Sequence, residues 1–191
     1  MHCVVGIDEV GRGPLAGPIT VGVVCVPVTF SWKECHDLKD SKQLTEAMRN
    51  HWYQWIKMHP SIRASVSSVS AKEIDRIGIV AAGTLAARRA LKKLKLSPKT
   101  AVIQLDYGLV VGTQWKQTAY IKGDERFPAI ALASIYAKVT RDTYMTRIAR
   151  QFPRYGFEVH KGYGTKKHRM SIKKSGISSL HRKTFCKKVI Y

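Results

Sequence analysis

The sequence predicts one α/β domain built in layers around a mixed β-sheet. Two runs rich in Val and Ile, residues 4–10 and 19–28, are typical of buried strands and lie close enough in the chain to form a hairpin. Farther along, apolar runs alternate with helical patterns, and Gly or Pro residues punctuate the boundaries. A chain of 191 residues with 45% hydrophobic residues can bury a sizeable core, so no second full-sized domain is expected.

The remaining elements follow from spacing and capping signals. Leu44, Met48, Trp52 and Ile56 recur at helical steps, and Thr45 is placed to cap the N-terminus of that helix. We predict further strands at 62–69, 101–106 and 118–122. Between and after them we predict a short helix opened by a capping box at 70–73 and a helix over 79–94. A long helix over 128–151 begins with Pro128, and a short helix over 166–174 is closed by Gly176.

The net charge narrows the class of partner. Thirty-three Lys and Arg residues against thirteen acids leave +20, which indicates nucleic acid first and an anionic membrane second. After Glu158 there are ten Lys or Arg residues and no acid, so we expect residues 151–191 to form a basic segment packed on the domain of residues 1–150. Apolar runs are too short to cross a bilayer, and Asp8 and Glu9 interrupt the first of them, which predicts a cytoplasmic protein.

Cysteine and histidine do not suggest a metal site. The four cysteines are scattered, without a C-x-x-C pair, and we expect reduced thiols. His160, His168 and His181 lie in the basic tail without H-x-x-x-H spacing, and we expect them to be solvated or to face phosphates.

Carboxylates at strand ends are the strongest chemical signal. Asp8 and Glu9 come where the first strand should end, Asp106 ends a later strand, and Asp124 follows the next one. A polar turn would explain a single Asp-Glu pair, but acids are expensive to bury without a cation. Oxygen-only ligands suit Mg²⁺ or Mn²⁺, and together with the basic charge they suggest two-metal phosphodiester hydrolysis.

Other motifs fit less well. The glycines at 11, 13 and 17 faintly resemble a dinucleotide-binding fingerprint, but the third glycine is one place late and the acids would repel a pyrophosphate. No Gly-Lys-Ser/Thr follows them, so the turn is not a P-loop, and Gly-Arg-Gly instead offers backbone N–H groups and one cation to a phosphate-bearing ligand.

Several motifs in order resemble the type 2 ribonucleases H (ribonuclease HII). The resemblance covers nearly the whole chain and is carried by residues 6–14 (GIDEVGRGP), 40–44 (DSKQL), 74–75 (ID), 122–124 (KGD), 133–142 (ASIYAKVTRD), 160–165 (HKGYGT) and 181–182 (HR). It implies an RNase H-like fold, with residues 1–150 as the catalytic domain and a small C-terminal helical portion. It also implies hydrolysis of RNA in RNA–DNA hybrids and nicking 5′ of ribonucleotides embedded in duplex DNA, leaving 3′-hydroxyl and 5′-phosphate ends.

The resemblance also implies roles for individual residues. The metal-binding catalytic acids would be Asp8, Glu9, Asp106 and Asp124, with Mg²⁺ or Mn²⁺ as cofactor. The ribose 2′-hydroxyl and a neighbouring phosphate would be read by Gly11, Arg12 and Gly13, and Tyr163 would bond the same hydroxyl and stack on the next sugar. Phosphates would be held by Lys42, Lys161 and the basic tail, without reading sequence. We expect a monomer without membrane association.

One departure from the family pattern keeps alternatives open. Asp106 is followed by Tyr107-Gly108, where the family usually has glycine directly after the acid. The alternatives are a protein that binds RNA–DNA hybrids with impaired catalysis, and a different carboxylate nuclease of the RNase H-like fold.

Overall fold

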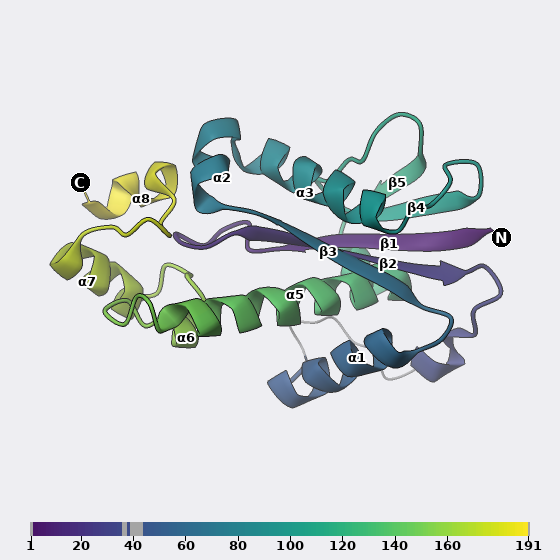
Figure 1. Ribbon diagram of the computed structural model, residues 1–191, viewed down its shortest axis with the longest axis horizontal. Helices are drawn as coiled ribbons and strands as arrows, with labels where there is room; N and C mark the ends of the chain where they lie inside the picture. The colour runs from purple at the N-terminus through teal and green to yellow at the C-terminus, as the bar shows by residue number, and fades with distance from the viewer. Residues whose placement is uncertain (1, 36–37, 39–43, 191) are drawn as a thin grey trace.

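A five-stranded mixed sheet forms the centre of the computed structural model, which describes residues 2–35, 38 and 44–190 (Figure 1). Its strands are β1 (Cys3–Val10), β2 (Ile19–Pro27), β3 (Arg63–Val69), β4 (Ala101–Asp106) and β5 (Lys116–Tyr120), in the spatial order β3-β2-β1-β4-β5. The β1–β2 and β2–β3 pairs are antiparallel, and the β1–β4 and β4–β5 pairs are parallel. The predicted α/β class, mixed sheet and opening hairpin are confirmed.

Helices cover both faces of this sheet (Figure 1). On one face lie α2 (Ala71–Ile77) and α3 (Ile79–Lys93), and on the other lie α1 (Glu46–Met58) and α5 (Pro128–Ala149). The remaining helical elements are η1 (Trp32–Cys35), α4 (Gly123–Arg126), α6 (Phe157–His160), α7 (Lys166–Ser175) and α8 (Lys183–Ile190). The predicted caps are confirmed, since the Thr45 and Ser70 side chains accept hydrogen bonds from the Met48 and Glu73 N–H groups.

Helix α5 packs closely against β1 and β2. A Cβ added to Gly6 on β1 would lie 2.0 Å from the Ala129 carbonyl oxygen, and one added to Gly22 on β2 would lie 2.3 Å from that of Ala133. These glycines allow the backbone of α5 to approach the strands directly. As a result, the side chains of α5 that follow Ala133 lie beside the last residues of β1.

The C-terminal helices pack at the end of the domain where β1 finishes (Figure 1). Phe157, Ile172 and Cys186 share an apolar core with Met145 of α5 and with Leu15, which follows the first turn. Backbone bonds add to this packing, because the Arg182 N–H donates to the Leu15 carbonyl and the Gly17 N–H donates to the Leu180 carbonyl. The segment after α5 is therefore joined to the β1–β2 connection.

The three histidines of this segment are buried, so the expectation of solvated or phosphate-facing side chains was wrong. His160, His168 and His181 are 8%, 0% and 3% exposed. The rings of His160 and His168 stack with centroids 4.3 Å apart, and the Nε2 atoms of His168 and His181 lie 3.1 Å apart. Aromatic side chains of α6 and the residues before it surround them, which the sequence spacing of the histidines did not indicate.

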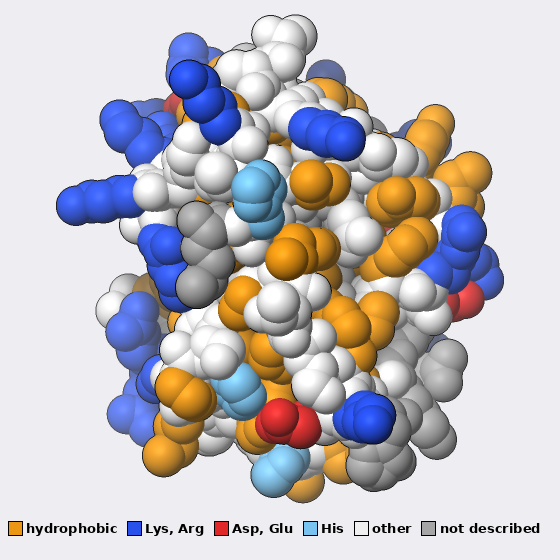
Figure 2. Space-filling view, turned by 90° about the vertical axis from the view of Figure 1, so that its right-hand side faces the viewer, with side chains coloured by type: hydrophobic (Ala, Val, Ile, Leu, Met, Phe, Trp, Pro, Cys, Tyr) orange, Lys and Arg blue, Asp and Glu red, His pale blue; other side chains and the backbone are white. Residues whose placement is uncertain are grey.

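Basic charge extends beyond the C-terminal segment. Lys and Arg side chains surround the face at the opposite end of the molecule, while apolar side chains occupy its middle (Figure 2). None of the described helices is long and apolar enough to cross a membrane. All four cysteines are buried and unpaired, as expected.

Candidate active site

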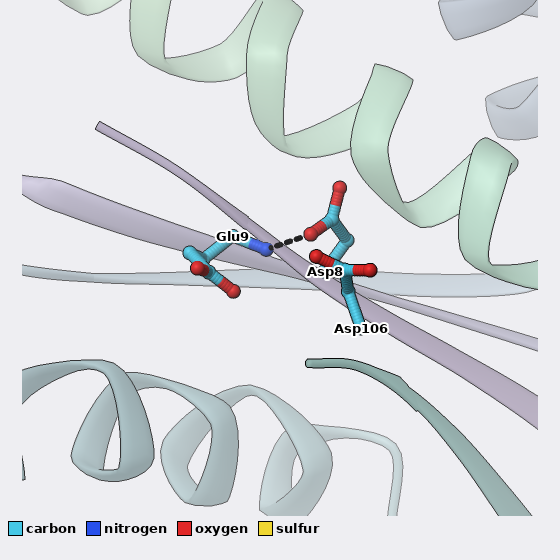
Figure 3. Close-up of side chains that lie close together, drawn as sticks. All are labelled: Asp8, Glu9 and Asp106. Carbon is cyan, nitrogen blue, oxygen red and sulfur yellow. Dashed lines mark hydrogen bonds between the residues drawn. The ribbon is translucent and has the colours of Figure 1, made fainter. Parts of the chain in front are cut away.

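Parallel pairing of β1 with β4 brings Asp8 and Asp106 together. Ile7 is opposite Leu105 in the register, so Asp8 and Asp106 are the next residues on neighbouring strands. Side chains one residue apart point to opposite faces of a strand, and Glu9 accordingly lies to one side of the pair (Figure 3). One carboxylate oxygen each of Asp8, Glu9 and Asp106 lies within 4.8 Å of the others.

Glu9 is only partly satisfied in this cluster. Its Oε1 accepts a hydrogen bond from Nη1 of Arg12 at 2.9 Å, and its backbone N–H donates to Oδ1 of Asp8 at 2.7 Å (Figure 3). The other carboxylate oxygen, Oε2, is buried and has no hydrogen-bond partner in the part of the chain that the structure describes. A buried acceptor without a partner is costly unless a ligand occupies its lone pairs.

Asp124 lines the same pocket but is not part of the compact trio. The strand before it is β5, which ends at Tyr120, so Asp124 lies in α4 and not directly beyond a strand as predicted. The Gly123 N–H donates to Oδ1 of Asp106 at 2.9 Å and ties this turn to β4. Asp124 is 7% exposed, and its charge acts on Asp8.

Burial dominates the electrostatics of the site. It raises the pKa of the Asp8 carboxyl well above its usual value, and the neighbouring charges of Glu9, Asp106 and Asp124 raise it further, while a Ser134 hydrogen bond opposes the rise. Burial also raises the pKa of Glu9, against the hydrogen bond and charge of Arg12. Negative charge is therefore concentrated here beyond what the described neighbours neutralise.

A divalent cation fits this arrangement. All the donors are carboxylate oxygens, the ligand type of hard ions such as Mg²⁺ and Mn²⁺, and Glu9 supplies the orphaned oxygen noted above. A bound cation would relieve the repulsion that raises the pKa of Asp8.

The rest of the pocket, about 310 Å³ in volume, comes from the first turn, from α5 and from the C-terminal segment. The turn contributes Gly11, Arg12 and Gly13, all three of which were predicted from the sequence, and the segment contributes Tyr163. From α5 come Ser134 and Lys138, which were not predicted as site residues. Their i, i+4 spacing places both on the face of α5 that borders the acids, which is the signal that could have identified them.

Of the two predicted phosphate-binding lysines, the structure describes Lys161, which does not line this pocket. Lys161 donates through Nζ to Oγ1 of Thr146 at 2.9 Å and lines a separate groove with Arg147 and Arg150. Lys42 lies outside the described residues. Asp142 pairs with Lys138 at 2.9 Å, at the i, i+4 spacing that is common for ion pairs on a helix.

Comparison with known proteins identifies the family. The family model described as ribonuclease HII matches residues 5–188. The chain belongs to the ribonuclease HII family. The ribonuclease HII of Pelagibacter ubique (strain HTCC1062) is 42% identical over 185 residues, which are 97% of this chain and 96% of that protein. That of Clostridioides difficile (strain 630) is 40% identical over 185 residues, 97% of this chain and 70% of that protein.

A solved structure agrees with the ribonuclease HII assignment. The crystal structure of ribonuclease H2 from Pyrococcus horikoshii OT3 has a TM-score of 0.78 with this chain at 26% identity, covering 98% of this chain and 97% of that one. Membership makes the chain an endoribonuclease that degrades RNA in RNA–DNA hybrids and depends on divalent metal ions. The RNase H-like fold expected from the resemblance is confirmed.

Proposed function

We propose that this ribonuclease HII nicks duplex DNA on the 5′ side of embedded ribonucleotides and cuts the RNA strand of longer hybrids, leaving 3′-hydroxyl and 5′-phosphate ends. The observation that carries the proposal is the position of the acidic trio, with oxygens within 4.8 Å, beside the Gly-Arg-Gly turn in one pocket. A phosphodiester bond next to a ribose can reach the acids while its sugar contacts the turn.

The acids would hold the cofactor. Asp8, Glu9 and Asp106, together with Asp124 of the same pocket, would bind Mg²⁺ or Mn²⁺. When bound, these ions supply an activated water and stabilise the leaving oxygen. Arg12 occupies one Glu9 oxygen, and the other, buried oxygen has no partner among the described residues and is the one we assign to a cation. Ser134 fixes the Asp8 carboxylate from α5.

Ribose recognition would come from the pocket wall. We assign the backbone N–H groups of Gly11, Arg12 and Gly13 to the 2′-hydroxyl and an adjacent phosphate, a combination that occurs only at a ribonucleotide. Tyr163, 39% exposed beside Lys138, would bond the same hydroxyl and cover the next sugar.

Phosphates farther from the cut would contact basic side chains. Lys161, the basic segment 151–191 and Lys42 would hold the duplex by charge without reading its sequence. We propose that the enzyme acts as a monomer in the cytoplasm, with residues 1–150 as the catalytic domain.

Cleavage mapping tests the proposal. A labelled duplex with one ribonucleotide is incubated with the enzyme and Mg²⁺ or Mn²⁺, beside an all-DNA duplex of the same sequence and a full hybrid. We expect a single nick 5′ of the ribonucleotide with a 3′ end that a polymerase extends, cleavage of the hybrid, and no cut in the DNA. A nick on the 3′ side, or equal cleavage of the all-DNA duplex, would contradict the proposal.

A further inference from the structure

Two arginines lie fully buried behind the Gly-Arg-Gly turn. Arg182, just before α8, and Arg141, in the middle of α5, are both 0% exposed. A guanidinium stays protonated at neutral pH and carries five donors, so its burial is expensive unless those donors are bonded. Neither side chain forms an ion pair with a carboxylate within 4.0 Å among the described residues.

Backbone carbonyls take up these donors instead. Arg182 donates to the carbonyls of Gly11, Arg12 and Gly17 at 2.6, 2.9 and 3.0 Å. Arg141 donates to the carbonyls of Pro18, Lys161 and Ala16 at 2.9, 3.0 and 3.2 Å. Five of these six carbonyls belong to residues 11–18, the segment that leads from the acidic pocket into β2.

These bonds orient the peptide groups of the turn. The C=O of one residue and the N–H of the next point in opposite directions across a planar peptide. Holding the Gly11 and Arg12 carbonyls against Arg182 therefore turns the N–H groups of Arg12 and Gly13 away from it. In the described part of the chain, no backbone carbonyl accepts a bond from either of these N–H groups.

The geometry also places positive charge behind the turn. Burial, reinforced by the nearby charge of Arg141, lowers the pKa of Arg182 to about 9, and burial lowers the pKa of Arg141 as well. A guanidinium stays protonated at pH 7, and the charge of Arg141 disfavours that of Arg182. An anionic group bound on the front of the turn would relieve this repulsion.

We propose that Arg182, supported by Arg141, is a positioning residue for ribose discrimination: it holds the backbone of residues 11–13 in the conformation that contacts the 2′-hydroxyl and its phosphate. The inference rests on the proposed function, in which this turn reads the ribose. Because Arg182 comes from the C-terminal segment, that segment takes part in substrate selection as well as in holding phosphates.

Binding measurements test this role with catalysis removed by Asp8→Asn. In that background with Mg²⁺ present, Kd is measured for a duplex with one ribonucleotide and for the matched all-DNA duplex. Arg182→Lys keeps a cation but loses the planar fork that bonds three carbonyls. We expect the preference for the ribonucleotide to fall about tenfold or more, as for loss of a charged hydrogen bond, with unchanged affinity for DNA.

Ile172→Ala is the matched control. Ile172 is 2% exposed in the same C-terminal core, on α7, and makes no hydrogen bond to residues 11–18. The variant should lower Tm at least as much as Arg182→Lys and keep the ribonucleotide preference. If Arg182→Lys does not fold, Arg141→Lys takes its place and should reduce the preference in the same direction.

The results distinguish the positioning role of Arg182 from the recognition of the ribose by the turn. A preference that survives Arg182→Lys or its replacement, or one that Ile172→Ala reduces equally, would overturn the positioning role and leave the proposed function standing. A parent protein without any preference for the ribonucleotide would instead refute the reading of the ribose by the turn.

Discussion

The acidic pocket and the C-terminal polar cluster, which comprises His160, His168, His181, Arg141 and Arg182, both bury polar groups but satisfy them differently. In the cluster every histidine ring nitrogen has a partner within 3.2 Å. In the pocket, Glu9 retains a buried oxygen without a partner among the described residues, and burial raises the pKa of Asp8 and Glu9.

The difference separates a site that requires a ligand from a framework that is complete without one. Buried polar groups are normally hydrogen-bonded, and strongly perturbed acids without full compensation gather where a protein binds ions or performs chemistry. A complete hydrogen-bond network instead fixes one conformation. The cluster holds the turn and Tyr163, and the acidic pocket that they line is where we propose that the reaction takes place.

Removing one acid of the pocket should have the largest effect on activity. Asp8→Asn should lower cleavage at least about 10³-fold, because a metal ligand contributes several kcal/mol to the transition state. The same change should leave Tm in EDTA unchanged or raise it, since the raised pKa of Asp8 means that its charge opposes folding at pH 7.

Adding Mg²⁺ completes this test. Excess Mg²⁺ should stabilise the wild type by about 1–3 kcal/mol and the variant by less, since a ligand that binds only the folded state raises its stability. Activity and thermal melts are measured on the same preparations. A variant that cuts at the wild-type rate, or that melts well below it in EDTA, would assign Asp8 a structural role.

The sequence predicted the pocket better than the cluster for a physical reason. An acid after an apolar β-branched run contradicts strand propensity and stands out locally, as Asp8 and Asp106 did. The hairpin and the later alternation of strands and helices predicted a mixed sheet, but the pairing of β1 with β4 that joins the two acids is known only from the structure. Asp124 was expected just beyond a strand over 118–122, but β5 ends at Tyr120 and Asp124 lies in α4, because element boundaries are the least certain part of such a prediction.

The cluster depends on contacts that sequence spacing does not encode. Arg182 binds carbonyls 165 to 171 residues away in the chain, and backbone acceptors leave no residue-type signal. His168 and His181 are buried only because the segment folds back onto α5, and basic neighbours in sequence suggested solvent instead. Charge counts describe composition, whereas burial depends on the tertiary fold.

Acid should destabilise the C-terminal cluster through its histidines. The His168 Nδ1–H donates to the Tyr163 carbonyl, so His168 Nε2 must accept from His181 Nε2–H, whose Nδ1 accepts from the Ser178 N–H. Burial first, and then neighbouring histidines, lower the pKa of His168 and of His181 to about 4. The unfolded state, with a histidine pKa near 6.5, therefore binds more protons between pH 6.5 and 4.

Stability should fall as the pH is lowered through this window, by about 1–2 kcal/mol per histidine between pH 7 and 5. Urea melts at several pH values measure it. His181→Gln should flatten the pH dependence, whereas the control His51→Gln, on the exposed surface of α1, should leave it unchanged. Equal slopes for His181→Gln and wild type would show that the histidines do not carry the effect.

We expect the smallest change in stability at Asp75, an aspartate that holds the C-terminal helix α8 in place. The Asp75 carboxylate on α2 accepts from the Lys183 N–H at 2.8 Å and from the Thr184 N–H at 3.0 Å, which caps the start of α8. Burial alone would raise its pKa, but the hydrogen bonds from Thr184 and Lys183 outweigh burial and lower it. Its charge therefore stabilises the fold, in contrast to the charge of Asp8.

Asp75→Asn should consequently lower stability by about 1 kcal/mol, as for loss of a helix cap, with or without Mg²⁺. Glu73→Gln, two residues away in an exposed pair with Arg76, is the control and should change stability by clearly less than Asp75→Asn does. Melts of the three proteins in EDTA and in Mg²⁺ measure both effects. The same Asp-to-Asn change should thus lower stability at position 75 but not at position 8, and a similar loss at both positions would mean that the two regions do not differ in how they compensate the charge of an aspartate.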